Sequence, residues 1–272
     1  MNFKRFLPFI LVILFPISLI YPQELGTNPK LSTKVLKEAV VLIKESLYSD
    51  KVGSGLLLEH EKSYFLITAE HVKKVTSSDS YISCGKLEND TISIKITDLI
   101  DKSLPMWRTH PNADLSVLKL SNKKGKLEPI KNQFLNSKYF VQVLPDSTIH
   151  NYLNFYIVGF PLGYGSYPVF NPSVKTSKLA SNQTFIKNSS LIYGKNDVFE
   201  GKNLIHILLE DPSVGGFSGG PVYYPGGSFD ERLVYGSTIP KCIGIVSGTI
   251  GDSTGGKMAI ITPSFLIFDL LY

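Results

Sequence analysis

The chain has 272 residues, of which 43% are apolar, enough to bury one large hydrophobic core or two modest ones. Lys and Arg number 28 and Asp and Glu 23, so the formal net charge is only +5. The nearest approach to a block of like charge after the N-terminus is Lys123–Lys126, which is typical of a solvated turn rather than a nucleic-acid-binding arm. We therefore expect no nucleic-acid partner. The two cysteines, Cys84 and Cys242, are too few for a disulfide scaffold, and we expect no bridge between them.

The N-terminal residues 1–22 read as a signal sequence or membrane anchor. Lys4 and Arg5 precede an apolar run, Phe6–Tyr21, that is too short to span a membrane comfortably, which favours a secretory signal sequence. No clear small-x-small cleavage site follows, so an uncleaved anchor stays open as the alternative. In both cases the working part of the protein is expected outside the cytoplasm, whether secreted, periplasmic or attached to a membrane through this segment.

The pattern that follows predicts an all-β protein. Leu31–Ala39 predicts one short helix, and from Val40 onward short runs rich in β-branched and aromatic residues are separated by Gly, Pro, Asn, Asp and Ser. The clearest predicted strands are Val40–Lys44, Gly53–Leu58, Tyr64–Thr68, Ile92–Ile96, Leu115–Leu120, Phe155–Val158, Leu204–Leu209 and Ile243–Val246.

A polar stretch over residues 121–145 divides this pattern into two parts of similar size. We accordingly predict one β-barrel unit over residues 30–147 and a second over residues 148–272, with the boundary near residue 148. Pro263–Leu271 looks helical again and is predicted to close the second unit.

The segment Gly215–Val222, GGFSGGPV, raises the question of chemistry. Its Gly-x-Ser-x-Gly core fits the nucleophile elbow of an α/β-hydrolase, the serine loop of a two-barrel protease, or a glycine-rich turn without chemistry. The elbow is excluded because all five histidines precede Ser218, whereas that fold places its histidine last. Gly219-Gly220-Pro221 is also poorly suited to start the helix that an elbow requires.

The surviving order is His, Asp, Ser. His71 follows the predicted strand Phe65–Thr68, after Ala69 and Glu70. Asp114 directly precedes the largely apolar run Leu115–Leu120. Elements of this kind can bring a carboxylate beneath an imidazole at the rim of a barrel. His71 would then take the proton of Ser218 as it attacks, while Asp114 holds the imidazole in the useful tautomer.

With these residues in place, the chain resembles the trypsin-like serine proteases of chymotrypsin fold, and among them the bacterial HtrA-type proteases. The resemblance covers residues 38–270 and rests on seven segments in the same order. They are Gly53–Gly55, Thr68–His71, Ala113–Leu120, Val158–Gly163, Gly216–Pro221, Gly244–Gly248 and Met258–Ser264. It implies two packed antiparallel β-barrels with a short C-terminal helix, and a serine endopeptidase that acts on polypeptides through an acyl-enzyme. It implies neither a metal nor another cofactor. Many HtrA-type relatives also carry a PDZ module, and we expect none in this chain.

The same chemistry requires donors for the negative oxygen of the tetrahedral intermediate. The backbone amides of Gly216 and Ser218 are the candidates for this oxyanion hole. Phe217 stands where digestive-type relatives carry an aspartate, so activation by N-terminal cleavage is not expected. Glu70 replaces a small residue beside His71, and its charge could raise the pKa of that histidine.

The resemblance also implies where a substrate would bind. The expected substrate-binding residues are Ser213, Val246, Ser247, Gly248 and Thr249, with the strand Ser247–Thr249 pairing with substrate backbone. Ser247 resembles the residue that hydrogen-bonds the catalytic aspartate. No acidic residue falls at the pocket base, which favours a small or apolar side chain over Lys or Arg.

Two alternatives stay open at this stage. The chain could be a catalytically silent chymotrypsin-fold binding protein, since fold alone does not dictate function. Ester hydrolysis would use the same site and cannot be separated from peptide hydrolysis by sequence.

Overall fold

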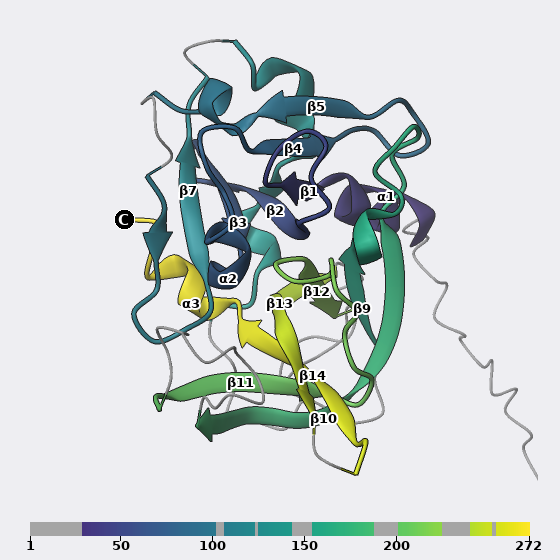
Figure 1. Cartoon of the computed structure of the whole chain (residues 1–272), viewed down its shortest axis with the longest axis vertical. Coiled ribbons are helices and arrows are strands. Elements are labelled where there is room, and N and C mark those ends of the chain that lie inside the picture. Colours follow the sequence, from purple (N-terminus) through teal and green to yellow (C-terminus); the bar gives the residue numbers. More distant parts are fainter. Residues whose placement is uncertain are drawn as a thin grey trace, which may run out of the picture.

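The computed structural model of the protein describes residues 29–101, 106–122, 125–142, 154–187, 201–224, 240–251 and 254–272. Strands dominate these residues and form two sheets, one above the other in Figure 1. The leader at residues 1–22 and the predicted boundary near residue 148 lie outside the described residues. In the part of the chain that is described, no helix is both long and apolar enough to cross a membrane.

The first sheet has the order β5-β4-β1-β2-β3-β7-β6, and β8 pairs with β2. Its neighbours are antiparallel except for the parallel pair β2–β8. The strands are β1 (Val40–Lys44), β2 (Val52–His60), β3 (Ser63–Thr68), β4 (Tyr81–Cys84), β5 (Ile92–Lys95), β6 (Arg108–Thr109), β7 (Ser116–Leu120) and β8 (Leu135–Asn136).

The central strands of this sheet are largely apolar because both of their faces are buried. In β1, Val41 and Ile43 pack into the core of the first sheet, whereas Val40 and Leu42 pack into a second core. That second core also contains Ile245 and other residues of the second barrel. Burial on both sides explains why the run does not alternate with polar residues, and it fixes the two halves of the molecule against each other.

The second sheet is a closed barrel of order β10-β11-β14-β13-β12-β9, with all pairs antiparallel. Its interior is filled by a core that includes Phe155, Ile207, Phe217 and Val246. The strands are β9 (Asn154–Gly159), β10 (Ser173–Lys187), β11 (Asn203–Leu209), β12 (Pro221–Tyr224), β13 (Lys241–Gly251) and β14 (Lys257–Pro263).

Helices are short and peripheral. The described residues contain α1 (Pro29–Glu38), α2 (Glu70–Lys73) and α3 (Phe265–Phe268), together with the 3-10 turns η1 (Ile96–Leu99), η2 (Glu128–Gln133), η3 (Ser137–Tyr139) and η4 (Pro161–Gly163). The predicted fold class is confirmed: the protein is all-β, with two packed sheets of chymotrypsin-like architecture and a short C-terminal helix.

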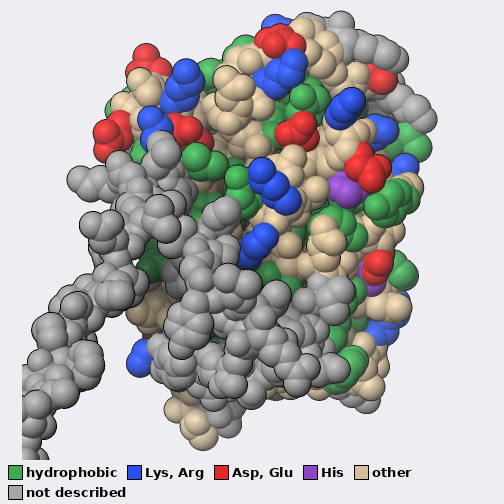
Figure 2. Space-filling view, turned by 180° about the vertical axis from the view of Figure 1, so that it is seen from behind, with side chains coloured by type: hydrophobic (Ala, Val, Ile, Leu, Met, Phe, Trp, Pro, Cys, Tyr) green, Lys and Arg blue, Asp and Glu red, His purple; other side chains and the backbone are tan. Residues whose placement is uncertain are grey.

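The surface and the cysteines add two further observations. On the face shown in Figure 2, Lys and Arg side chains are interspersed with Asp and Glu. Cys84 and Cys242 are both free thiols and both buried, so this fold is held by core packing without a bridge between them.

Candidate active site

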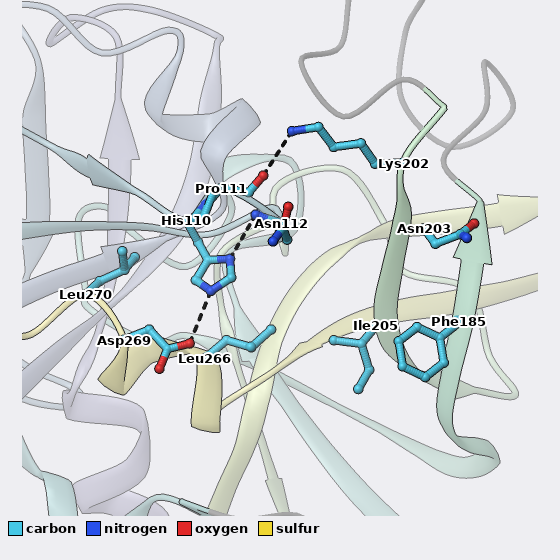
Figure 3. Close-up of a pocket in the computed structure, with 10 residues that line it drawn as sticks. All are labelled: His110, Pro111, Asn112, Phe185, Lys202, Asn203, Ile205, Leu266, Asp269 and Leu270. Atoms are coloured by element: carbon cyan, nitrogen blue, oxygen red, sulfur yellow. Dashed lines mark hydrogen bonds and ion pairs between the residues drawn. The ribbon is translucent and has the colours of Figure 1, made fainter.

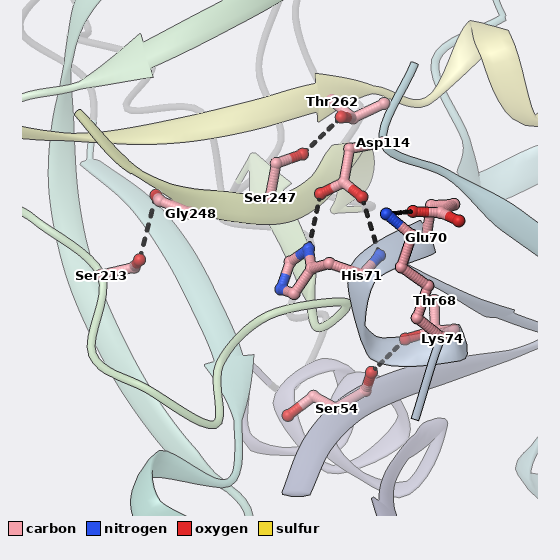
Figure 4. A network of polar contacts seen from close by, with 10 residues as sticks. All are labelled: Ser54, Thr68, Glu70, His71, Lys74, Asp114, Ser213, Ser247, Gly248 and Thr262. Atoms are coloured by element: carbon pink, nitrogen blue, oxygen red, sulfur yellow. Dashed lines mark hydrogen bonds and ion pairs between the residues drawn. The ribbon is translucent and has the colours of Figure 1, made fainter. Parts of the chain in front are cut away.

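The imidazole of His71 is fixed by the carboxylate of Asp114. His71 lies in α2, directly after β3, and Asp114 lies two residues before β7; the pairing of Thr68 with Ser116 places these two strand ends side by side. His71 Nδ1 donates to Asp114 Oδ2 over 2.8 Å, and the backbone amide of His71 donates to Oδ1 over 3.1 Å (Figure 4). The carboxylate is 1% exposed and the imidazole 35%. Asp114 therefore holds the ring from the buried side, while Nε2 points away from it (Figure 4).

Ser218 lies in the loop between β11 and β12, and glycines shape that loop. Gly216 has a φ of +96°, and a Cβ there would lie 2.3 Å from the carbonyl oxygen of Phe160. Gly219 has a φ of +82°, and a Cβ there would lie 2.2 Å from the carbonyl oxygen of Ser54. Both positions combine a left-handed backbone with a close approach, so only glycine fits without strain.

The backbone around Gly216 leaves two amides available. The carbonyl of Gly215 accepts a hydrogen bond of 2.8 Å from the amide of Leu162. Because the C=O and N–H of a trans peptide point in opposite directions, this bond turns the amide of Gly216 away from Leu162. The amides of Gly216 and Ser218 have no acceptor among the residues that the structure describes. Two unengaged donors beside a serine hydroxyl are what an oxyanion hole requires.

Ser54, on β2 of the first sheet, anchors the serine loop. Its amide donates to the carbonyl of Ser218 over 2.7 Å, and its hydroxyl donates to the carbonyl of Gly216 over 2.7 Å. The same hydroxyl accepts from the amide of Phe160 over 3.0 Å, and the carbonyl of Ser54 accepts from the hydroxyl of Thr68 over 2.7 Å (Figure 4). Sequence reasoning noted Gly53-Ser54-Gly55 only as a supporting match and missed this role. The signal was a serine between two glycines in an otherwise apolar strand.

A histidine lines each of two pockets formed by described residues, and the other lining residues distinguish the two pockets. His71 and Ser218 line one pocket of about 460 Å³, together with Gly216. A pocket of about 800 Å³ contains the pair His110 Nε2–Asp269 Oδ2 at 3.3 Å (Figure 3), but none of the described residues that line it is a serine, threonine or cysteine. Among its described lining residues the larger pocket thus has a histidine–carboxylate pair without a nucleophile, and the smaller pocket is the candidate active site.

Among the expected substrate-binding residues, Ser213 is hydrogen-bonded to Gly248 and Thr249, whereas the side chains of Val246 and Ser247 contact other parts of the second barrel. Ser213 lies against Gly248 and Thr249: its hydroxyl donates to the Gly248 carbonyl over 3.0 Å (Figure 4), and its amide donates to the Thr249 hydroxyl over 3.1 Å. Val246 is fully buried and packs in the core of the second barrel. The hydroxyl of Ser247 is hydrogen-bonded to that of Thr262 rather than to Asp114 (Figure 4).

One edge of β13 is open beside the candidate site. β12 pairs with β13 only as far as Ile245, whereas β14 follows β13 to Gly251. The edge of Ser247–Thr249 that faces away from β14 therefore has no partner strand among the described residues. An open edge of this kind can accept an extended peptide by β-addition.

The charged and titratable groups near the pair have identifiable partners. Glu70 forms an ion pair with Lys74 at 3.2 Å, which balances the charge that the sequence placed beside His71. His206 is 1% exposed, and burial lowers its pKa to about 4, with the charge of Asp114 opposing the shift. Over the residues that the structure describes, no group of three or more His, Cys, Asp or Glu could hold a metal ion.

Comparison with known proteins establishes the fold of the chain. No protein-family model and no curated protein matches the chain. Among solved structures, the MamO protease domain from Magnetospirillum magneticum matches with a TM-score of 0.56 at 15% identity, over 88% of this chain and 99% of that one. The active form of the Rv3671c protease from M. tuberculosis matches with a TM-score of 0.54 at 13% identity, over 88% and 82%.

The HtrA-type protease AlgW with tripeptide matches with a TM-score of 0.50 at 15% identity, over 89% of this chain and 61% of that one. At such identities the likeness establishes the fold, which is that of trypsin-like and HtrA-type serine proteases. The activity has to be argued from the site.

Proposed function

We propose that the protein is a serine endopeptidase with Ser218 as nucleophile, His71 as general base and acid, and Asp114 as the group that orients His71. The observation that supports it best is the hydrogen bond from His71 to the buried carboxylate of Asp114, because His71 lines the same pocket as Ser218, beside two unengaged amides. No metal or other cofactor enters the mechanism.

In the proposed reaction the hydroxyl oxygen of Ser218 attacks the substrate carbonyl carbon, and Nε2 of His71 takes the hydroxyl proton. The carbonyl oxygen becomes negative and accepts hydrogen bonds from the amides of Gly216 and Ser218, each worth about 2.7–4 kcal/mol in the transition state. His71 then gives the proton to the leaving amine as the C–N bond breaks. Water, deprotonated by His71, then attacks the acyl carbonyl carbon, the ester bond to Ser218 breaks, and His71 returns the proton to the hydroxyl oxygen of Ser218. The carboxylate of Asp114 stabilises the imidazolium that forms during both acylation and deacylation.

The acyl side of the substrate would pair with the open edge of β13 at Ser247–Thr249. The side chain of the residue whose carbonyl is attacked would then point between this strand and Ser213. The hydrogen bonds that join Ser213 to Gly248 and Thr249 span that space. They support a preference for a small side chain at this position.

The N-terminal basic and apolar sequence supports a location outside the cytoplasm, with attachment to a membrane if the segment is retained. Phe217 is 3% exposed and packs in the interior core of the second barrel. A buried phenyl ring here offers nothing for a newly cut N-terminus to pair with, so we propose that activity needs no N-terminal cleavage.

Labelling and cleavage test this function together. Purified protein is incubated with a fluorophosphonate probe and with unfolded casein, beside the variants Ser218→Ala and Asp114→Asn. We expect labelling at Ser218 and casein fragments from the wild type, neither from Ser218→Ala, and a rate about 10⁴-fold lower from Asp114→Asn. A folded wild-type protein that neither labels nor cleaves under any condition would leave the silent binding protein as the better explanation.

A further inference from the structure

The pocket that contains His71 and Ser218 has an apolar wall that the proposed catalytic steps do not use. Four aliphatic side chains line it, and they come from three separate segments: Val52, Val72, Val75 and Leu162. Val72 is buried, Val52 and Val75 are half-buried, and Leu162 is 65% exposed. A concave site of this size with an apolar lining is typical of a binding subsite.

The wall lies on the leaving-group side of Ser218. The leaving amine must receive its proton from His71, so the chain that follows the cleaved bond has to pass beside that imidazole. His71 lines this pocket, whereas none of the open-edge residues Ser247–Thr249 does. The acyl half of the substrate and the apolar wall are therefore on different sides of the nucleophile.

Leu162 carries a conformational cost that its backbone bond alone does not explain. Its φ of +52° and ψ of 21° place it in the left-handed region, which is strained for a residue with a Cβ. Its amide donates to Gly215, but glycine or asparagine would supply the same amide at lower strain. A leucine that is both strained and 65% exposed is explained if its side chain contacts a bound ligand.

The charged residues that line the pocket indicate which kind of side chain it can accept. Lys51 lines the pocket, but its ammonium group is 3.0 Å from the carboxylate of Glu45, which balances its charge. Asp50 also lines the pocket and has no ion-pair partner among the described residues. An acidic side chain entering here would meet an apolar wall and an unbalanced carboxylate, which disfavours it.

We propose that Val52, Val72, Val75 and Leu162 form the subsite for the residue directly after the cleaved bond, and that it selects an aliphatic side chain and rejects an acidic one. The inference rests on the proposed endopeptidase function and adds the leaving-group half of the substrate preference. Leu162 determines the preference through its side chain and positions Gly215 through its amide.

The test uses internally quenched peptides that differ only in the residue after the cleaved bond: Leu, Gly or Asp, with the cleaved bond identified by mass spectrometry. We expect kcat/KM for Leu to exceed that for Gly by roughly tenfold and that for Asp by more. In Leu162→Asn, asparagine keeps the left-handed backbone and the amide but removes the aliphatic side chain. The Leu-to-Gly ratio should then fall below about threefold, while the Gly peptide is still cleaved. Val35→Asn, at an exposed valine on α1 outside the pocket, should keep the wild-type ratio.

A binding measurement separates this inference from the proposed function. The affinities of the same peptides are measured for Ser218→Ala, with and without Leu162→Asn. Cleavage or binding with no preference for Leu, or a preference unchanged in Leu162→Asn, overturns the subsite. A wild type that cleaves nothing, combined with a Leu preference in binding that Leu162→Asn removes, supports the subsite and refutes the endopeptidase. Neither cleavage nor binding refutes both.

Discussion

Replacing Ser54 by alanine tests how the serine loop is held. The Ser54 hydroxyl is fully buried and makes two bonds, to the Gly216 carbonyl at 2.7 Å and from the Phe160 amide at 3.0 Å. In Ser54→Ala both backbone groups lose their partner. A buried polar group without a partner costs about 1–3 kcal/mol, so we expect unfolding to become easier by about 2–4 kcal/mol.

The effect on catalysis follows from the position of Gly216. With the Gly216 carbonyl released, the loop that carries the amide of Gly216 loses one of its anchors, so the amide is held less firmly toward the substrate oxygen. Complete loss of one oxyanion donor lowers kcat by about 10²–10³. Because the bond from Leu162 to Gly215 remains, we expect a partial loss, roughly 10–100-fold in kcat. KM should change little, because Ser54 lies beneath the loop and does not line the pocket.

Ser80 provides a matched control. It is also fully buried, and its hydroxyl likewise donates to one carbonyl, of Glu45, and accepts from one amide, of Ser77. Ser80→Ala should therefore lose a similar free energy of unfolding, measured by urea denaturation, yet keep its kcat and its rate of fluorophosphonate labelling. Equal losses of kcat in the two variants, or an unchanged kcat in Ser54→Ala, would refute the role assigned to Ser54.

Three other perturbations have clear expectations. Gly216→Ala places a Cβ 2.3 Å from the carbonyl oxygen of Phe160, so the loop must shift; kcat should fall by about 10² or more with secondary structure retained by circular dichroism, and normal turnover would contradict the loop geometry. Burial lowers the pKa of His206 to about 4, so between about pH 6.5 and 4 the unfolded chain binds a proton that the folded chain does not. Stability should fall as pH is lowered through this window, by an amount on the order of 3 kcal/mol, and less in His206→Leu; urea midpoints at pH 7 and 4.5 that shift equally in both proteins would refute this. Burial raises the pKa of the thiols of Cys84 and Cys242 to about 12, so a thiol reagent at pH 8 should modify neither until urea is added, and fast labelling of the native protein would be inconsistent with their burial.

The sequence predicted the fold class and the strands that carry strong apolar runs. β1 was predicted with its observed bounds, and β2, β3, β7, β9 and β11 to within two residues at each end. β10 was missed because its 15 residues are mostly polar and its apolar positions, such as Val174 and Leu179, are widely spaced. β4 was missed because a strand of four residues is too short for an alternating pattern of apolar and polar residues to be recognised.

For the candidate site, the sequence predicts which residues take part but not which atoms they contact. The order of His71, Asp114 and Ser218 is visible in the chain, and the roles assigned to them stay predictions. The bond from Ser54 to Gly216 joins residues 162 positions apart, and no local pattern encodes it. Leu162 looked like an ordinary residue between proline and glycine, because a strained φ leaves no mark in the sequence.

Ser247 and Val246 show the limit of reasoning by resemblance. Both belong to a segment similar to a known one, yet the hydroxyl of Ser247 contacts Thr262 and Val246 packs in the barrel core. β13 carries a register shift between Val246 and Gly248, and such an irregularity decides which side chains face the cleft. Resemblance to a known segment predicts where the segment lies in the fold, but the local strand register determines which way each side chain points.

The anchoring of the serine loop by Ser54 also bears on when the proposed enzyme could first act. Ser54, His71 and Asp114 all belong to the first half of the chain, and Ser218 to the second. As synthesis proceeds from the N-terminus, an emerging chain has base and acid but no nucleophile, so it can damage neither itself nor its neighbours. Once Ser218 has been made, its loop still has to close on the amide and hydroxyl of Ser54. Docking of the two halves would then serve as the activation step that other proteases achieve by cutting a propeptide.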